Sequence, residues 1–329
     1  MKALVCREFG PVQSLLVMDV PKPAVTPGRV LVRVEAASVN YPDALLVQGK
    51  YQSKPELPFV AGSEVAGTVE AVGEGVANLN RGERALAFCG TGGFAEYVLV
   101  DADRVFPLPV HVDFAVAAAM PLVYATSYHA LQDRARLAPG ETLLVLGAGG
   151  GVGSAAVELG KLLGARVIAA ASSKEKLETA QRCGADQLID YSDGDFRAKL
   201  REIVGSRGVD VIYDPVGGAY SEPALRSMAW EGRYLVVGFA AGDIPRIPLN
   251  LTLLKGCSIV GVFWGEFRRR FPERVAQELA QLVTWLRDGK IHPQVSKCYP
   301  LSEGPGALQS LLERGASGKL ILTPHQASN

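Results

Sequence analysis

The feature that most constrains the fold is a glycine-dense turn at residues 147–153, which lies between an apolar segment and an amphipathic one. Residues 142–146 are a short run of β-branched and leucine side chains, which is typical of a strand buried on both faces. From Ser154 onward the apolar residues recur with helical spacing. The sequence therefore predicts a strand, a tight turn and a helix, the first half of a dinucleotide-binding βαβ unit.

The glycines suit a pyrophosphate, which can lie on backbone N–H groups at a helix start only where no Cβ blocks its approach. A flexible loop is the alternative, but a second predicted strand at 166–171 follows at the distance that a nucleotide-binding unit requires. We therefore predict pyrophosphate contacts from four residues of the turn and helix start: Gly150, Gly151, Val152 and Gly153.

The residues that follow the second strand predict the kind of dinucleotide. An NAD site usually has Asp or Glu there to hold the ribose 2′-OH. This chain has Ala170 and Ala171, followed by Ser172, Ser173, Lys174 and Lys176. Hydroxyl and ammonium groups suit a 2′-phosphate, so we predict NADPH rather than NADH. The alternative is a solvated first helical turn, where lysine is slightly unfavourable next to the helix dipole.

Composition excludes several classes of function. The 329 residues contain 34 Lys plus Arg and 34 Asp plus Glu, so no net charge attracts nucleic acid or a membrane surface. No signal-peptide pattern and no apolar run of spanning length occurs. The five cysteines form no C-x-x-C pair, which fits a reducing compartment. We expect a cytoplasmic protein that acts on a small molecule.

The order of the predicted elements indicates an α/β protein with two domains. Short strands separated by glycine-rich turns fill the first 120 residues and indicate a compact barrel. Strands and helices then alternate from 143 to 262, as in a doubly wound sheet of six parallel strands. The last strands, near 295–301 and 319–323, are expected to rejoin the barrel. The predicted domains are 1–122 with 266–329, and 123–265.

Four stretches carry a resemblance to a known family: residues 39–43, 58–69, 81–85 and 117–128. With the glycine turn, they resemble the zinc-free quinone oxidoreductases, the zeta-crystallin-like group of the medium-chain dehydrogenase/reductase superfamily. The resemblance covers nearly the whole chain and implies a GroES-like β-barrel catalytic domain and a Rossmann domain. One residue departs from the pattern, because Glu158 stands where the family usually has Gln.

The resemblance also bears on metal binding. Zinc-dependent relatives have Cys, His and a third ligand where this chain has Asn40, Ser63 and Leu122, none of which is a good ligand for Zn²⁺. The four-cysteine structural lobe of those relatives is missing as well. The histidines are too dispersed in sequence to argue for a site: His111, His129, His292 and His325. We therefore predict no metal.

The resemblance implies catalytic or positioning roles for four residues. Asn40 would donate an amide N–H to the nicotinamide or the substrate carbonyl, and Asp43 would orient its neighbours. Tyr51 would offer a phenol to a developing enolate or quinol oxygen, and Thr126 would bond the carboxamide or ribose. Each has a structural alternative. Asn40 could be a turn residue before Pro42, and Asp43 could be a helix N-cap. Tyr51 could pack near Pro55, and the Thr126 hydroxyl could bond back to the backbone of its own helix.

On the cofactor side, Ser172, Ser173, Lys176 and Tyr191 match family positions around the adenosine 2′-phosphate. The nicotinamide side is expected to be lined by Phe239, Phe263 and Trp264, although aromatics at strand ends also serve as core. Lys319 is expected to reach back to the cofactor, with a solvated lysine as the alternative.

The implied reaction is hydride transfer from NADPH to a quinone or an α,β-unsaturated carbonyl without zinc. Two alternatives remain at this point. One is a 2-enoyl-thioester reductase, which the basic run Arg268–Arg270 would favour if it meets an anionic substrate. The other is a non-enzymatic NADPH-binding protein of the crystallin or sensor kind. The resemblance also implies a homodimer, and the apolar strand at 258–263 would be a bare sheet edge unless another chain pairs with it.

Overall fold

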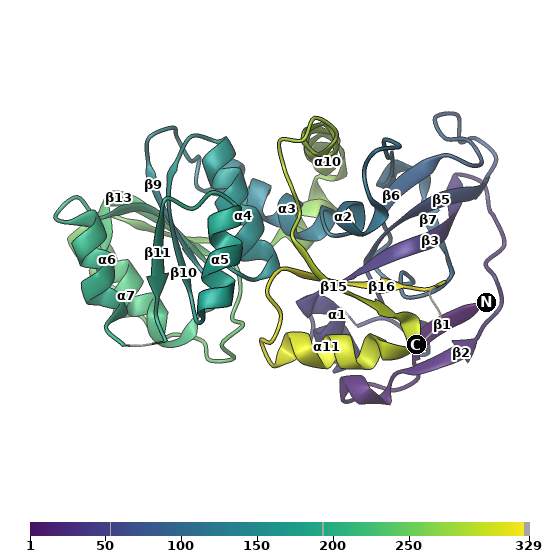
Figure 1. Ribbon diagram of the computed structural model, residues 1–329, viewed down its shortest axis with the longest axis horizontal. Coiled ribbons are helices and arrows are strands. Elements are labelled where there is room, and N and C mark those ends of the chain that lie inside the picture. Colours follow the sequence, from purple (N-terminus) through teal and green to yellow (C-terminus); the bar gives the residue numbers. More distant parts are fainter. Residues whose placement is uncertain (53, 193, 326–329) are drawn as a thin grey trace. The chain divides into compact units, whose positions relative to one another are not determined.

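The computed structural model describes residues 1–52, 54–192 and 194–325, and its contacts divide the chain into two units (Figure 1). One unit joins Met1–Leu122 to Leu279–Asn329, and the other is Val123–Glu278. The chain therefore returns to the first unit later than residue 266. Contacts within the second unit explain the difference: the Phe267 ring stacks on His129 with centroids 3.9 Å apart, and Arg274 pairs with Asp133 at 2.9 Å.

In the residues that the structure describes, the second unit is built on a six-stranded sheet in which all neighbouring strands are parallel. The strands, in sheet order, are β11 (Gln187–Asp190), β10 (Arg166–Ala171), β9 (Thr142–Leu146), β12 (Val209–Asp214), β13 (Met228–Val236) and β14 (Ser258–Gly261). Every residue of β9 is buried, as expected for a central parallel strand covered on both faces. The order reverses at β9, and ligands of such sheets bind beside the carboxyl ends of the strands at this point.

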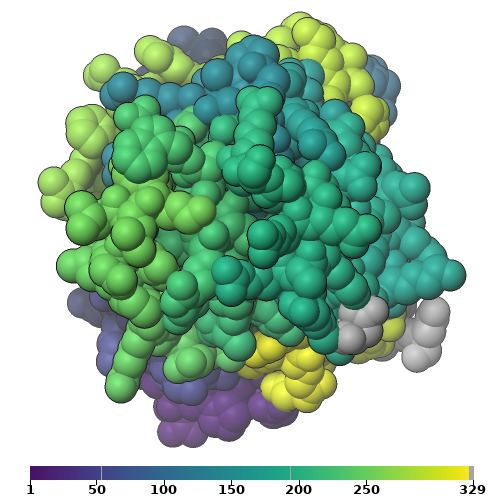
Figure 2. Space-filling view, turned by 90° about the vertical axis from the view of Figure 1, so that its left-hand side faces the viewer, coloured from purple at the N-terminus to yellow at the C-terminus, as the bar shows by residue number. Residues whose placement is uncertain are grey.

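Helices lie on both sides of this sheet: Figure 1 shows α6 and α7 on one side and α4 and α5 on the other. Figure 2 looks onto the teal and green residues on the side of α6 and α7. The helical segments of the unit are α3 (Pro121–Tyr128, which begins in the first unit), the π-helical η3 (His129–Arg134), α4 (Gly151–Leu162), α5 (Lys174–Arg182), α6 (Phe196–Val204), η4 (Gly218–Tyr220), α7 (Ser221–Arg226), α8 (Asn250–Lys255) and α9 (Trp264–Arg270). The predicted doubly wound fold is confirmed.

The first unit contains two sheets in its described residues. A small one pairs β1 (Lys2–Cys6) with β2 (Leu16–Asp19) and β4 (Phe59–Val60). The larger one contains β15 (Val295–Pro300), β16 (Lys319–Thr323), β3 (Arg29–Val39), β5 (Glu64–Val72), β6 (Arg84–Phe88) and β8 (Val105–Pro107) in that order, with β7 (Tyr97–Asp101) also paired to β3. Because β16 pairs with β3, the end of the chain rejoins the N-terminal sheet as predicted.

The helical segments of the first unit are short, apart from the shared helix α10. They are η1 (Val12–Ser14), α1 (Tyr41–Val47), η2 (Ala102–Arg104), α2 (Phe114–Ala118), η5 (Leu301–Glu303) and α11 (Gly304–Leu312), and α10 (Pro272–Arg287) continues into this unit from the second. One apolar cluster, which includes Leu4, Val32, Val65 and Leu322, forms its core. Among the described helices, none combines the length and the apolar character needed to cross a membrane.

Candidate functional site

The glycine turn joins β9 to α4 in the second unit. Strand β9 ends at Leu146, and α4 begins at Gly151 with Gly150 as its N-cap. A Cβ on Gly153 would lie 2.2 Å from the carbonyl oxygen of Gly147, so only glycine fits there. The first N–H groups of a helix have no acceptor within it. The turn therefore presents backbone donors and the positive end of the α4 dipole, which together suit an anion such as a pyrophosphate.

A positively charged side chain stands beside this turn. A Cβ on Gly149 would lie 2.4 Å from the Cβ of Lys176, so the start of α5 packs directly against the turn. The Nζ atom of Lys176 donates to the Ser172 Oγ at 3.4 Å, and the Ser173 Oγ caps α5 by accepting from the Lys176 N–H. These three predicted residues are thus together, and the end of β10 at Ala171 carries no carboxylate.

Tyr191 belongs to an aromatic cluster that follows β11. Its ring lies 4.2 Å from that of Tyr220 and meets Phe196 edge-on at 6.3 Å, measured between centroids. The side chain is buried, so the packing alternative describes much of its environment. Its role beside an adenine stays a prediction.

The three aromatics predicted for the nicotinamide side have different environments. Phe239 follows β13, and it is exposed, as is Phe263 after β14. Trp264 begins α9 and is buried. Strands β13 and β14 are neighbours, so Phe239 and Phe263 both follow carboxyl ends at the same edge of the sheet.

Thr126 and Glu158 lie on helices of the same unit. Thr126 is half-buried in α3. Glu158, the departure from the family pattern, is buried in α4 and accepts a hydrogen bond of 2.5 Å from the Tyr124 hydroxyl. Burial and this carboxylate raise the pKa of Tyr124. Glu158 therefore has a structural role, as the acceptor of a buried hydrogen bond from Tyr124, that the sequence did not predict.

The first unit contains a buried cluster of charged and polar side chains: Asn40, Asp43, Glu64 and Lys319. The Lys319 Nζ donates to the Asn40 Oδ1 and, at 3.3 Å, to the Glu64 Oε1. The Asn40 Nδ2 donates to the same Glu64 oxygen at 2.7 Å. The second Glu64 oxygen accepts from the Leu122 N–H at 2.6 Å. Sequence reasoning assigned no role to Glu64, although a charge at the start of an apolar strand was a signal.

Asn40 is the N-cap of α1, and Asp43, for which the sequence offered the N-cap position as an alternative, is the N3 residue instead. The Asn40 N–H donates to the Asp43 Oδ2 at 2.9 Å, which completes a capping box at the start of α1. Burial raises the pKa of Asp43 to about 7 and lowers that of Lys319. Because the Asn40 amide already donates to Glu64 and to the Ser38 carbonyl, a bond from it to substrate would replace one of these contacts.

Tyr51 is half-buried in the loop after α1. Tyr51 lies in the first unit and Thr126 in the second. The proposed roles of Asn40, Asp43, Tyr51, Thr126 and Lys319 stay predictions.

The residues at the family's zinc position do not suit that ion. Asn40 is bonded through both ends of its amide, and the Lys319 ammonium lies against it. Leu122 offers only an apolar side chain, and its N–H is a donor to Glu64. A donor set with an adjacent buried cation does not favour Zn²⁺.

Comparisons with known proteins identify the family. Residues 26–110 match the alcohol dehydrogenase GroES-like domain, and residues 151–281 match the zinc-binding dehydrogenase family. The quinone oxidoreductase-like protein 2 homolog of Nematostella vectensis is 37% identical over 99% of this chain and 89% of its own length. The chain belongs to the quinone oxidoreductase group of the medium-chain dehydrogenase/reductase superfamily.

Other members of the group show the same likeness over the full length. Human quinone oxidoreductase is 32% identical over 98% of this chain and 97% of its own. Escherichia coli quinone oxidoreductase, solved in complex with NADPH, has a TM-score of 0.89 and 27% identity, covering 98% of this chain and 100% of that one. A mycobacterial protein solved with NADPH has a TM-score of 0.90 and 32% identity, and the match covers 98% of this chain and 100% of that one. The family membership predicted from the sequence is confirmed, and the chain is an oxidoreductase.

Proposed function

We propose that this oxidoreductase uses NADPH to reduce quinones or α,β-unsaturated carbonyls without zinc. The observation that carries the proposal is the position of Lys176, which packs against the glycine turn and contacts Ser172 where an NAD site would have a carboxylate. The relatives solved with NADPH support the same cofactor.

In this proposal the glycine turn and the first turn of α4 hold the pyrophosphate, and Ser172, Ser173 and Lys176 hold the 2′-phosphate. NADPH supplies the hydride when it is bound. The protein contributes orientation and electrostatics, and Phe239 and Phe263 provide apolar surface beside the nicotinamide. Quinones and enones are already electrophilic, so no Lewis acid is required.

The test is a paired assay of NADPH and NADH oxidation with 1,4-benzoquinone, 9,10-phenanthrenequinone and crotonyl-CoA as acceptors. The variants are Lys176→Ala and, as the control, Lys161→Ala, whose ammonium pairs with Asp186 at 2.8 Å near the carboxyl end of α4, away from the glycine turn. We expect fast NADPH-dependent quinone reduction, and a loss of the preference for NADPH over NADH of about tenfold or more in Lys176→Ala only, from the loss of a charge-assisted contact. An unchanged preference in Lys176→Ala would contradict the 2′-phosphate site.

The same assay separates the two alternatives. A preference for crotonyl-CoA would favour a thioester reductase, but Arg269 and Arg270 are already paired with Glu266 at 2.7 and 2.6 Å, which leaves less positive charge for an anionic substrate. Tight NADPH binding with no turnover on any acceptor would favour the non-enzymatic alternative.

The proposal includes a homodimer formed through β14 and a cytoplasmic location. Strand β14 is at the end of the sheet order and pairs only with β13 among the described strands. Its Ile259 side chain is exposed. An apolar edge strand is a template for pairing with a second copy.

A further inference from the structure

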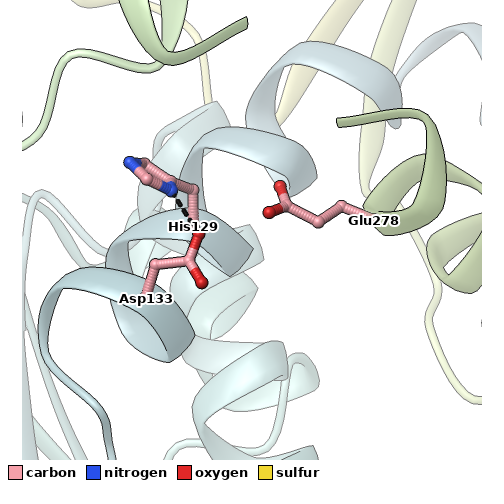
Figure 3. A group of neighbouring side chains, drawn as sticks. All are labelled: His129, Asp133 and Glu278. Atoms are coloured by element: carbon pink, nitrogen blue, oxygen red, sulfur yellow. Dashed lines mark hydrogen bonds and ion pairs between the residues drawn. The ribbon is translucent and has the colours of Figure 1, made fainter. Parts of the chain in front are cut away.

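A histidine and two carboxyl groups that are far apart in sequence come together in the second unit (Figure 3). His129 and Asp133 lie on the π-helical segment η3, and Glu278 projects toward them from α10. One ligand atom from each residue can be chosen so that all three lie within 4.8 Å of one another. Short π-helical segments are rare and are frequently found at functional sites.

Glu278 carries the independent observation. Its side chain points into the cluster, the residue is only 8% exposed, and among the described residues its Oε2 atom has no hydrogen-bond partner. A buried oxygen without a partner is costly, and a cation would compensate for it.

We propose that His129, Asp133 and Glu278 bind a divalent transition-metal ion, with Zn²⁺ as the best fit. Imidazole nitrogens and carboxylate oxygens are both ligands that zinc accepts, and water can complete the coordination as a fourth ligand. The Phe267 ring stacks on the His129 imidazole and fixes its plane. Two ligands at about 2.1 Å from a tetrahedral Zn²⁺ lie roughly 3.4 Å apart. On binding, the 2.6 Å distance between His129 Nδ1 and Asp133 Oδ2 would therefore lengthen. Any pair of ligand atoms that now lies between about 3.4 and 4.8 Å apart would move closer together.

A bound cation would compete with the arginines that surround the cluster. Asp133 accepts from His129 through Oδ2 and pairs with Arg274 through Oδ1, which is 2.9 Å from the guanidinium. With both carboxyls ionised the three ligands carry two negative charges, which Arg274 opposes together with Arg134 and Arg270 in the lining of the adjoining hollow. The Arg274 side chain is 53% exposed and can turn toward water. A hollow of about 770 Å³, lined in part by His129 and Asp133, gives an ion access to the cluster.

This cluster is separate from the family's zinc position, whose counterparts Asn40, Ser63 and Leu122 belong to the first unit. The proposal therefore differs from the sequence-based prediction of no metal, which considered the histidines without the two carboxyls. The ion would join η3 to the start of α10 and stabilise the second unit.

The experiment is calorimetric titration of tag-free, chelator-treated full-length protein with Zn²⁺ and, separately, Mg²⁺. We expect one Zn²⁺ per chain and much weaker Mg²⁺ binding, because Mg²⁺ prefers six oxygen ligands. Glu278→Gln should lower Zn²⁺ affinity tenfold or more, and Arg274→Gln should raise it by removing a competing cation. Glu273→Gln, an exposed position on the same helix, is the matched control and should leave affinity unchanged.

A second variant and a spectroscopic readout keep the test decisive if Glu278→Gln does not fold. His129→Gln should also lower the affinity, and Co²⁺ in place of Zn²⁺ should show a four-coordinate absorption band that His129→Gln alters. Zn²⁺ binding of equal strength in wild type and both ligand variants would assign the ion to another site and overturn the proposal. Absence of binding to the wild type would overturn it too, whatever the NADPH assays show.

Discussion

Among single residues, Lys319 compensates the buried charge of Glu64. Replacing Lys319 by Met keeps most of the buried stem but removes the ammonium that lies 3.3 Å from the Glu64 carboxylate, which is fully buried. An unpaired buried charge costs about 3–5 kcal/mol, so the free energy of unfolding in urea should fall by about that amount. The double variant Lys319→Met, Glu64→Gln should lose less stability than Lys319→Met alone, because the buried carboxylate of Glu64 is replaced by a neutral amide. Equal losses in the single and double variants would show that the pair is not coupled.

Asp43 makes stability depend on pH. Burial raises its pKa from 3.8 to about 7, so the folded chain holds this proton more tightly than the unfolded chain does. The contribution of Asp43 to stability therefore falls as the pH rises from about 4 to about 7, and the full cost is present above that range. Asp43→Asn removes the titration and keeps an acceptor for the Asn40 N–H.

Urea unfolding at pH 5 and pH 8 measures this effect. Relative to wild type, the free energy of unfolding of Asp43→Asn should rise by about 3 kcal/mol between the two pH values, since each of the two units between pH 5 and the pKa of about 7 corresponds to about 1.4 kcal/mol. Leu45→Ala on the same helix is a control without a titratable group and should shift stability equally at both pH values. A constant difference between wild type and Asp43→Asn would refute the raised pKa.

The sequence predicted roles for Asn40, Asp43 and Lys319 but gave no sign that they share a cluster with Glu64. Residues 40, 64 and 319 meet only because β3, β5 and β16 are brought into one sheet. His129, Asp133 and Glu278 were missed for a similar reason: dispersed histidines indicate nothing until the fold places carboxyls beside one of them.

At the scale of elements, two alanine substitutions in the glycine turn should have different effects, one on stability and the other on NADPH binding. A Cβ on Gly153 would overlap the Gly147 carbonyl at 2.2 Å, whereas a Cβ on Gly150 would have its nearest contact at 3.4 Å. Gly153→Ala should therefore destabilise the turn, with an expected cost of about 1–3 kcal/mol for overpacking. Gly150→Ala should fold normally but weaken NADPH binding tenfold or more, because its methyl group obstructs the pyrophosphate. Thermal unfolding and NADPH fluorescence titration measure the two effects, and unchanged NADPH affinity in Gly150→Ala would place the pyrophosphate elsewhere.

Periodicity predicted β9 and α4 closely because a buried parallel strand and an amphipathic helix differ sharply in pattern. It did not predict the π-helical segment η3, which continues directly from α3. A π-helix has no distinct hydrophobic period over six residues, so its presence depends on contacts such as those of His129 with Phe267 and Asp133.

At the scale of the whole molecule, the alternation of strands and helices was enough to predict a barrel-like unit and a doubly wound unit. The second boundary differed because α9 and the first turns of α10 are bound to the second unit by side-chain contacts, which no local pattern encodes. Among the final strands only β16 is an apolar, buried run, and it lies between β15 and β3, which places the end of the chain inside the N-terminal sheet.

The proposed homodimer can be tested by substitutions on the two edge strands of the parallel sheet, β14 and β11. Ile259 lies on β14, and Leu188 lies on β11 at the opposite edge, with exposed fractions of 42% and 37%. A lysine on an edge strand opposes pairing with another chain. We therefore expect wild type to be a dimer by light scattering at micromolar concentration, Ile259→Lys to be a monomer and Leu188→Lys to stay dimeric. Both variants should keep the wild-type far-UV spectrum, since each side chain faces solvent. A monomeric wild type would contradict the dimer itself, and dissociation by Leu188→Lys alone would assign the interface to β11.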